Sequence, residues 1–171
     1  MSIRTIMILP KFLNIDIIND IRKKYDPLAS LVSPHITLAF PFDSKMTNED
    51  LKLHLEECLN DIKPFTLELV GFSKQGSKYG NYLFLNVAQG MEVIKNIHDR
   101  LYTNELKQFD VDCDYIPHMT VGKVSSMELL DEAFDDVSKC NDKFSTVVKK
   151  ISVEMIGAHE ESIIIIEHEL N

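Results

Sequence analysis

Two five-residue segments of nearly the same sequence lie about half a chain length apart. Pro34-His35-Ile36-Thr37-Leu38 matches Pro117-His118-Met119-Thr120-Val121, and equivalent positions are 83 residues apart in a chain of 171. Around both copies, the apolar pattern predicts a strand at the segment with one helix before it and another after it. A repeat of this kind indicates two similar halves, roughly 1–88 and 89–171, related by a pseudo-two-fold axis.

Periodic apolar residues along the rest of the chain predict an α+β fold. No linker rich in proline, glycine or serine separates the halves, so we expect one bilobal domain, residues 1–171, with a shared core. Expected helices lie at about 14–26, 47–62, 91–101 and 126–137. Expected strands lie at 3–9, 35–40, 65–69, 82–87, 118–124, 144–156 and 162–168, with a loop or hairpin at 71–80 and a loop at 108–115.

Each repeated segment places a histidine and a threonine on the same face of its strand. Residues i and i+2 of a strand point the same way, so the aliphatic residue between the histidine and the threonine enters the core. Continued alternation puts Ala39 and Gly122 next on the two functional faces. Such small residues are expected to leave room for a ligand beside His35-Ile36-Thr37 and His118-Met119-Thr120.

These residue types suit the cleavage of a phosphodiester or a cyclic phosphate. The reaction needs a base for the nucleophile and an acid for the leaving oxygen, and His35 and His118 can hold opposite protonation states near neutral pH. The hydroxyls of Thr37 and Thr120 can donate to phosphoryl oxygens that gain charge in the transition state. A single His-x-Thr unit is common and usually structural, whereas two units at equivalent places favour one shared site.

Signatures of other catalytic chemistries are weak in this sequence. Catalytic zinc commonly takes three protein ligands, and no Asp, Glu or third His keeps a recognisable spacing with either unit, so no metal and no other cofactor are expected. Gly-x-Ser-x-Gly and Walker-type motifs do not occur. Cys58, Cys113 and Cys140 are scattered, which indicates a reducing compartment rather than a disulfide framework.

Charge and hydropathy narrow the expected partners and location. The 18 basic and 27 acidic residues give a net charge of −9, which argues against nonspecific binding of duplex DNA through many contacts to its phosphates. A small nucleotide or an RNA terminus in a locally basic cleft remains compatible with this charge. No stretch approaches the roughly twenty apolar residues of a membrane span, and Arg4 and Pro10 interrupt the short N-terminal apolar run. We expect a cytoplasmic monomer.

The repeated motif resembles the signature of the 2H phosphoesterases, the superfamily that includes 2′-5′ RNA ligase-like proteins and cyclic nucleotide phosphodiesterases. That signature is two His-x-Thr/Ser units flanked by hydrophobic residues. The segments at 22–27, 101–103 and 115–118 also resemble a short bacterial subgroup of phosphoesterases. The resemblance extends through most of the chain.

This resemblance implies a fold and a set of residue roles. It implies a bilobal duplicated fold in which antiparallel sheets line a central cleft and helices lie outside, without a metal. It also implies that His35 and His118 are the acid and base, and that Thr37 and Thr120 hold the phosphate. Members act on several 2′,3′-cyclic or 2′-5′-linked compounds, so the resemblance does not select one substrate.

Three further residues are candidates for contact with a substrate. Many relatives carry a basic residue near Lys123, but strict alternation places its side chain on the face opposite Thr120, and a solvated strand end explains it equally well. Tyr115 and Phe42 could stack on an unpaired base. Packing is the better explanation for Phe42.

The other polar residues have simpler expected roles. Lys74 and Lys78 lie in a segment that could cover the cleft, although loop lysines are usually solvated. Tyr25 is expected in the core. Surface or capping roles are expected for the remaining histidines, His54, His98, His159 and His168.

The leading functional prediction is therefore an enzyme that hydrolyses a 2′,3′-cyclic phosphate or a 2′-5′ phosphodiester. RNA 2′-5′ ligation is the reverse of comparable chemistry and stays open. A noncatalytic nucleotide or RNA-end binding protein is the alternative from another class, and turnover of a cyclic phosphate would separate it from the enzyme. A purely structural protein would leave the duplicated motif unexplained.

Overall fold

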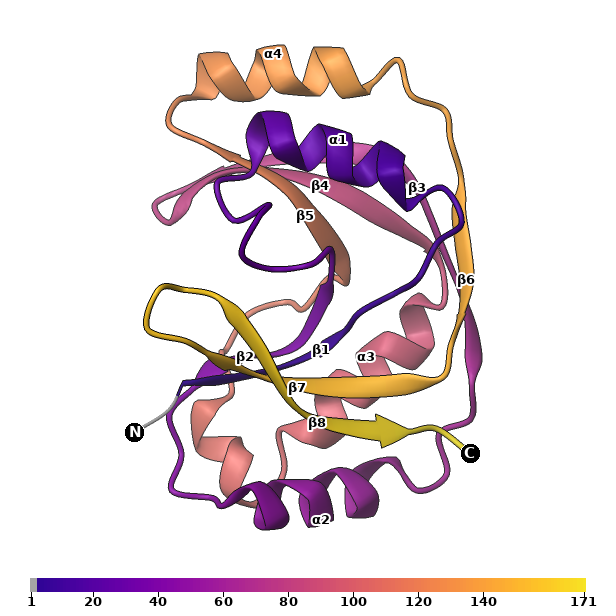
Figure 1. Ribbon diagram of the computed structural model, residues 1–171, viewed down its shortest axis with the longest axis vertical. Helices are drawn as coiled ribbons and strands as arrows, with labels where there is room; N and C mark the ends of the chain where they lie inside the picture. Colours follow the sequence, from indigo (N-terminus) through magenta and orange to yellow (C-terminus); the bar gives the residue numbers. More distant parts are fainter. Residues whose placement is uncertain (1–2) are drawn as a thin grey trace.

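The computed structural model describes residues 3–171, which form a single antiparallel sheet covered by helices (Figure 1). Eight strands run in the order β6-β3-β4-β5-β2-β1-β7-β8. Their bounds are β1 Arg4–Ile8, β2 Ile36–Phe42, β3 Phe65–Ser77, β4 Gly80–Gln89, β5 His118–Val124, β6 Phe144–Val148, β7 Lys150–Ile156 and β8 Ser162–Glu169. The α+β prediction is confirmed.

The helices cover the two ends of this sheet. One pair packs on the strands β3 to β6, with α1 against β5 and α4 against β3 and β4. The other pair packs on the remaining strands, with α3 against β2 and α2 against β8. The bounds are α1 Ile15–Tyr25, α2 Asn48–Leu59, α3 Met91–Leu101, the 3₁₀ helix η1 Asn104–Phe109 and α4 Met127–Val137.

The strand order is symmetric about the β5–β2 pair, which defines two lobes. β4, β3 and β6 continue from β5, while β1, β7 and β8 continue from β2. Each lobe takes elements from both ends of the chain, because α1 packs on β5 and α3 packs on β2. The division near residue 88 lies at the end of β4, so the sequence halves do not coincide with the lobes in space.

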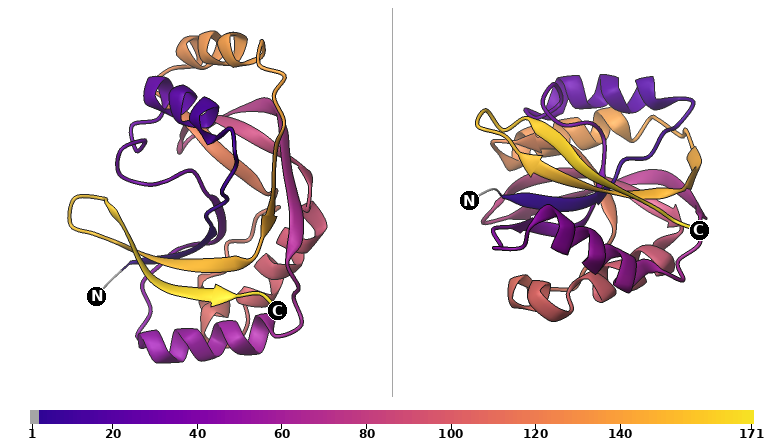
Figure 2. Two further views of the ribbon diagram at one scale, coloured as in Figure 1. Left: turned by 45° about the vertical axis from the view of Figure 1, so that its right-hand side comes forward. Right: turned by 60° about the horizontal axis from the view of Figure 1, so that its bottom comes forward.

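The lobes meet at two places within the sheet. Among the described residues, β2 and β5 pair at one position, Ile36 opposite Met119. At the far end, Lys149 alone separates β6 from β7, so one bent segment runs from lobe to lobe. Figure 2 shows the resulting curl of the strands. The expected sheets are thus the two halves of one curled sheet.

Local signals explain where the helices begin. The Thr47 hydroxyl accepts from the Asp50 amide, and the Asp50 side chain accepts from the Thr47 amide, which is a capping box for α2. Ser126 caps α4, because its hydroxyl accepts from the Leu129 amide. Asn14 precedes α1 without a capping bond, and its side-chain amide instead donates to the Lys143 carbonyl. Asn14 therefore ties α1 to the distant segment before β6.

Three segments differ in detail from the expected elements. Residues 71–80 form a hairpin in which β3 continues to Ser77, so this part of the chain is mostly strand. The single strand expected over 144–156 is divided into β6 and β7 at Lys149. A 3₁₀ helix, η1, precedes and overlaps the loop expected at 108–115.

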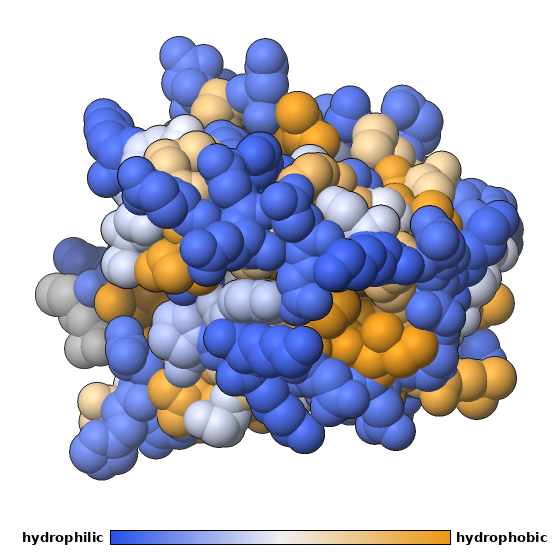
Figure 3. Space-filling model, turned by 90° about the horizontal axis from the view of Figure 1, so that it is seen from above, coloured by the Kyte–Doolittle hydropathy of each residue, from blue (hydrophilic) through white to orange (hydrophobic). Residues whose placement is uncertain are grey.

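The surface over α4 carries mainly hydrophilic residues, with separate hydrophobic patches (Figure 3). Met127 and Leu129 are half-exposed apolar residues of this helix. Within residues 3–171, every helix is too short or too polar to cross a bilayer.

Candidate active site

The two His-x-Thr units lie side by side where the lobes meet. Ile36 pairs with Met119 in antiparallel register. The same register places His35 opposite Thr120 and Thr37 opposite His118. Paired residues of neighbouring strands point to the same face of a sheet, so all four polar side chains share one face. The structure therefore brings together the histidines and threonines that the repeat singled out.

Both imidazole rings are oriented by the same kind of hydrogen bond. The His35 Nδ1–H donates to the Ser33 carbonyl at 2.8 Å, and the His118 Nδ1–H donates to the Ile116 carbonyl at 2.8 Å. A carbonyl only accepts, so each neutral ring carries its proton on Nδ1. The Nε2 lone pair of each ring is then available to take a proton. The two histidines are equivalent in tautomer as well as in position.

Burial favours the neutral form of both rings. Desolvation lowers the pKa of His35 below its usual 6.5, and the bond to the Ser33 carbonyl partly opposes this effect. Desolvation also lowers the pKa of His118, and the nearby positive charge of His35 lowers that pKa further. Charging one ring thus disfavours charging the other. This coupling disfavours the state in which both rings are charged.

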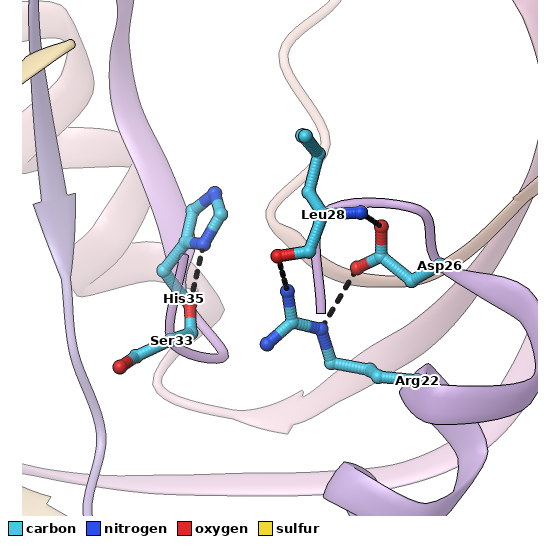
Figure 4. Close-up of polar contacts among 5 residues, drawn as sticks. All are labelled: Arg22, Asp26, Leu28, Ser33 and His35. Atoms are coloured by element: carbon cyan, nitrogen blue, oxygen red, sulfur yellow. Dashed lines mark hydrogen bonds and ion pairs between the residues drawn. The ribbon is translucent and has the colours of Figure 1, made fainter. Parts of the chain in front are cut away.

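A buried arginine organises the segment that leads to His35 (Figure 4). Arg22 on α1 is 2% exposed, and its Nε donates to Asp26 at 2.8 Å. Its Nη2 donates to the Leu28 carbonyl at 3.4 Å, while the other Asp26 oxygen accepts from the Leu28 amide. Figure 4 shows the guanidinium bonded to the Leu28 carbonyl and to Asp26, with His35 and Ser33 across from it. Sequence reasoning missed Arg22, although it follows Ile18 by one helical turn on the buried stripe of α1.

A β-bulge interrupts each motif strand three residues after its histidine. On β2, Thr37 pairs with Met7 and Ala39 pairs with Ile6, which leaves Leu38 as the extra residue. On β5, the register shifts in the same way between Thr120 and Gly122, with Val121 as the extra residue. A bulge of this kind reverses the facing of the residues that follow it, up to the next register shift, which on β2 lies between Ala39 and Phe42.

The bulges overturn two expectations based on strict alternation. Ala39 is fully buried, and a Cβ on Gly122 would lie 2.9 Å from the Tyr25 Cβ, so both small residues face the core. They leave room for packing and not for a ligand. Lys123 is exposed and pairs with Tyr82, and its Nζ lies 5.4 Å from the centre of the Tyr82 ring. Lys123 therefore shares the face of Thr120.

An aromatic residue of β4 contacts the second histidine. Phe84 pairs with Thr120, so its side chain lies on the same face as the catalytic candidates. The rings of Phe84 and His118 are 3.8 Å apart, centre to centre. Asn86 pairs directly with His118, and its Oδ1 accepts from the Ser73 hydroxyl at 2.7 Å. Sequence reasoning did not single out Phe84 or Asn86, because only the strand pairing brings them beside His118.

Tyr115 lies at the open edge of β2. Its hydroxyl donates to the Thr37 carbonyl at 2.7 Å, and its ring stacks on His98 at 3.7 Å. The His98 Nδ1–H donates to the Leu38 carbonyl at 2.7 Å, and the Phe40 amide donates to the Tyr102 hydroxyl at 2.8 Å. These side chains satisfy backbone groups of β2 beyond its single pair with β5. The contacts of Tyr115 fit a positioning role, with one face of the ring covered by His98.

The other histidines divide into two groups. His54 and His98 are buried, so a surface role is wrong for both. The His54 Nε2–H donates to the Leu101 carbonyl at the end of α3, which is a capping interaction. His159 is exposed and His168 is partly exposed, in agreement with the expected surface roles.

The two hairpin lysines have different surroundings. Lys74 pairs with Leu83, a core-facing residue, and its ammonium forms an ion pair with Asp131 on α4. It therefore lies on the helix-covered face, so a role in covering the cleft is wrong for it. Lys78 sits in the turn, with its Nζ 5.0 Å from the Tyr79 ring centre.

Two aromatic residues have mainly structural contacts. Phe42 is buried against the Phe109 ring, which confirms the packing explanation. Tyr25 packs on Gly122, and its hydroxyl donates to Asp136 at 2.6 Å. That hydrogen bond raises the pKa of Tyr25 to about 12. Among residues 3–171, no cluster of three or more His, Cys, Asp or Glu side chains is arranged to hold a metal ion.

Known proteins share this sequence pattern. Residues 10–156 match the family model described as the 2′-5′ RNA ligase superfamily. A Bacillus licheniformis protein named "Putative phosphoesterase" is 32% identical over 123 residues, which cover 71% of this chain and 69% of the relative. A protein of the same description from Bacillus mycoides is 32% identical over 122 residues, covering 69% and 67%.

Solved structures share the fold at low sequence identity. Escherichia coli LigT in complex with 3′-AMP superposes with a TM-score of 0.60 at 14% identity, covering 99% of this chain and 98% of LigT. TT0787 of Thermus thermophilus superposes with a TM-score of 0.62 at 13% identity, with the same coverage. The sequence match spans most of the chain, and the fold likeness spans nearly all of it. On this ground the chain belongs to the 2′-5′ RNA ligase superfamily, the 2H phosphoesterases.

Proposed function

We propose that this protein hydrolyses a 2′,3′-cyclic phosphate or a 2′-5′ phosphodiester of a nucleotide or RNA end, with His35 and His118 as general acid and base. One observation carries the proposal. The antiparallel pairing of Ile36 with Met119 sets each histidine opposite the threonine of the other unit, and the Nδ1 bonds leave both Nε2 atoms available. A phosphate between the units would meet two proton-transfer groups and two hydroxyl donors.

The reaction on a cyclic phosphate follows from this arrangement. The neutral imidazole takes a proton from water as the oxygen of that water bonds to phosphorus. The charged imidazole gives its proton to the ribose oxygen as the bond from phosphorus to that oxygen breaks. Thr37 and Thr120 donate to the remaining phosphoryl oxygens, where charge develops. The two histidines end with exchanged protonation states, and solvent restores the first state.

The equivalence of the two rings also bears on the direction of the reaction. Because both carry the proton on Nδ1, either ring can begin as the base. Ligation of a 2′-5′ bond would use the same two groups with their roles reversed. Among the structural neighbours, LigT has been crystallised with ATP, 3′-AMP and NADP⁺, which supports a nucleotide as the ligand class.

The decisive experiment is a turnover screen of wild type, His35→Ala and His118→Ala in parallel. The substrates are the four 2′,3′-cyclic mononucleotides, short oligonucleotides ending in a 2′,3′-cyclic phosphate, and 2′-5′-linked oligonucleotides. Each variant should lose nearly all turnover, because neither proton transfer can be omitted. Near wild-type turnover by both variants on a substrate that wild type cleaves would refute the acid-base roles.

Two further arms test the alternatives to this mechanism. Activity should survive EDTA, since the proposed steps use only protein side chains. Loss with EDTA and recovery with zinc or manganese would replace the proposal with a metal-dependent mechanism. Tight binding of these ligands by wild type without any turnover would instead favour a noncatalytic binding protein.

A further inference from the structure

A second pocket, of about 740 Å³, lies between α3 and the segment that follows η1. On α3, Lys95, His98 and Asp99 line it, and residues 110–116 form the other wall. The two His-x-Thr units lie outside this pocket. Its volume is in the range of small-molecule sites and is far larger than a single ion needs. We call it the α3 pocket.

The α3 pocket contains a buried imidazole with one unpartnered nitrogen. His98 is 7% exposed, and its Nδ1–H donates to the Leu38 carbonyl at 2.7 Å. The other ring nitrogen, Nε2, has no hydrogen-bond partner within residues 3–171. Because a neutral ring with its proton on Nδ1 accepts at Nε2, this atom needs a donor. A buried acceptor is costly when it stays unpaired, so Nε2 points to a ligand that donates.

Four carboxylates also line the α3 pocket, with little opposing charge. Among residues 3–171, Lys95 is the single basic side chain in the lining. Within the same range, no ion pair engages any of the four carboxylates. Ionised carboxylates only accept hydrogen bonds, and together they attract cations. The pocket therefore favours a cation with several N–H donors. The four carboxylates belong to Asp99, Asp110, Asp112 and Asp114.

Apolar and aromatic side chains line the pocket as well. Val111 and Ile116 are exposed aliphatic residues that can pack on methylene groups. The rings of Tyr102 and Tyr115 can attract an ammonium group to their faces. The acidic groups do not converge on one point, because within residues 3–171 no three His, Cys, Asp or Glu side chains are arranged to hold a metal ion. Spaced charges on an apolar chain fit this lining better than a metal ion.

We propose that the α3 pocket binds an aliphatic diamine or polyamine. The ammonium groups would donate to the carboxylates and to the Nε2 atom of His98. The methylene chain between them would pack on Val111 and Ile116. Such a ligand supplies the donors, the positive charge and the apolar surface that the lining lacks.

The α3 pocket shares residues with the supports of both histidine units. The Tyr115 hydroxyl donates to the Thr37 carbonyl at 2.7 Å, and the Ile116 carbonyl accepts from the His118 Nδ1–H at 2.8 Å. A bound amine would thus contact the segment that orients His118. Binding of the amine requires no turnover, so this inference stands apart from the proposed function.

Isothermal titration calorimetry of the whole chain at low salt tests the proposal with spermidine and cadaverine as probes. Spermidine should bind more tightly than cadaverine, because it carries one more positive charge. Added salt should weaken both interactions. The neutral diol with the carbon chain of cadaverine is the matched ligand control, and it should not bind.

A triple variant tests the acidic wall. Asp110→Asn, Asp112→Asn and Asp114→Asn together remove three exposed charges, and spermidine binding should weaken by about 3- to 100-fold. A second triple variant makes the same change in net charge on α4 and should bind spermidine as wild type does. It consists of Glu128→Gln, Glu132→Gln and Asp135→Asn.

His98→Asn tests the buried acceptor. The asparagine amide can still donate to the Leu38 carbonyl, while the Nε2 acceptor is lost. Spermidine binding should weaken by about 10- to 150-fold, as for a hydrogen bond to a charged group. Circular dichroism melts check that the variant folds, and the aspartate variants test the pocket in any case.

The outcomes are distinct from those for hydrolysis. Equal spermidine binding by wild type and by the aspartate triple variant would overturn the proposal, and so would binding of the diol as tight as that of cadaverine. Mg²⁺ binding that is tighter than spermidine binding and is lost in the aspartate variant would replace the amine with a metal ion. His35→Ala should bind spermidine as wild type does, whatever its effect on turnover.

Discussion

At the scale of single residues, His35 and His118 make the same kind of backbone hydrogen bond but have different neighbouring side chains. Both rings carry the proton on Nδ1, and burial lowers the pKa of both. His35 is next to Arg22, which also lowers its pKa, and Glu154, which raises it. His118 instead packs against Phe84. The repeat gives both histidines the same backbone hydrogen bond, and under the proposed mechanism these different neighbours would decide which of them acts as the base.

The pH dependence of kcat/KM should be bell-shaped with its maximum below pH 6.5. Activity falls on the acid side as the base gains a proton, and on the alkaline side as the acid loses its proton. Both pKa values are lowered from 6.5 in the free protein, which moves both limbs toward acid pH. A bound phosphate dianion or monoanion favours the charged imidazoles, so the kcat profile should lie to the alkaline side of the kcat/KM profile. A kcat/KM maximum near pH 8 would contradict the lowered pKa values.

The two threonines should contribute equally to catalysis. Thr37→Val and Thr120→Val keep the shape of the side chain and remove one donor to the phosphoryl oxygens. Each should raise the activation free energy by about 2–4 kcal/mol, by analogy with the loss of one oxyanion donor. This corresponds to a loss of roughly 30- to 1,000-fold in kcat. Single-turnover kinetics on a cyclic phosphate measures it, with Thr103→Val on the protein surface as a control; a loss confined to KM would indicate ground-state binding only.

At the scale of secondary-structure elements, the two bulges decide which residues of β2 and β5 face the candidate site. Simple alternation correctly predicts the facing of the histidines and threonines, because they precede the bulges. It fails for Ala39, Gly122 and Lys123, because they follow the bulges. A bulge is a property of a strand and its partner together, so a single strand's sequence does not reveal it.

Gly122→Ala should destabilise the fold rather than obstruct the site. The new Cβ would lie 2.9 Å from the Tyr25 Cβ and 3.2 Å from the Leu83 Cβ. Relief of this overlap requires movement of α1 relative to β5, with a loss of about 1–3 kcal/mol in the free energy of unfolding. Urea denaturation measures this loss. Unchanged stability with a raised KM would mean that Gly122 faces the ligand after all.

Tyr115→Phe separates a positioning role from base stacking. The variant keeps the ring and removes the donor to the Thr37 carbonyl. A buried acceptor left without a partner costs about 1–3 kcal/mol, so stability should fall, and kcat should fall with it as β2 shifts. Denaturation and steady-state kinetics check both effects against Tyr79→Phe on the surface. If Tyr115 acts by stacking on a base, Tyr115→Phe should behave almost as wild type.

At the scale of the whole molecule, the sequence predicted the secondary-structure elements better than the way in which they pack into two lobes. The helices and the motif strands follow from local apolar periodicity, and the pairing of the two units follows from the repeat. The composition of the two lobes does not follow from the sequence pattern, because the packing of α1 on β5 and of α3 on β2 depends on contacts between residues far apart in the chain. The burial of Arg22 was not predicted either, because a charged residue is rarely fully buried unless it is paired, and its partners Asp26 and Leu28 become evident only in the structure.

The single residue pair between β2 and β5 has a mechanical consequence. His35 and His118, the proposed acid and base, flank the part of the sheet where, within residues 3–171, Ile36 and Met119 form the single residue pair between β2 and β5. A small rotation of one lobe about the Ile36–Met119 pair would separate the two imidazoles, while each ring would keep the hydrogen bond to its own backbone carbonyl. A bound phosphate that contacts side chains of both β2 and β5 would form a second connection between the two strands. The bound ligand would thus help to fix the two histidines in the geometry in which it reacts, whereas in the free protein the Ile36–Met119 pair alone sets the register of β2 against β5 within residues 3–171.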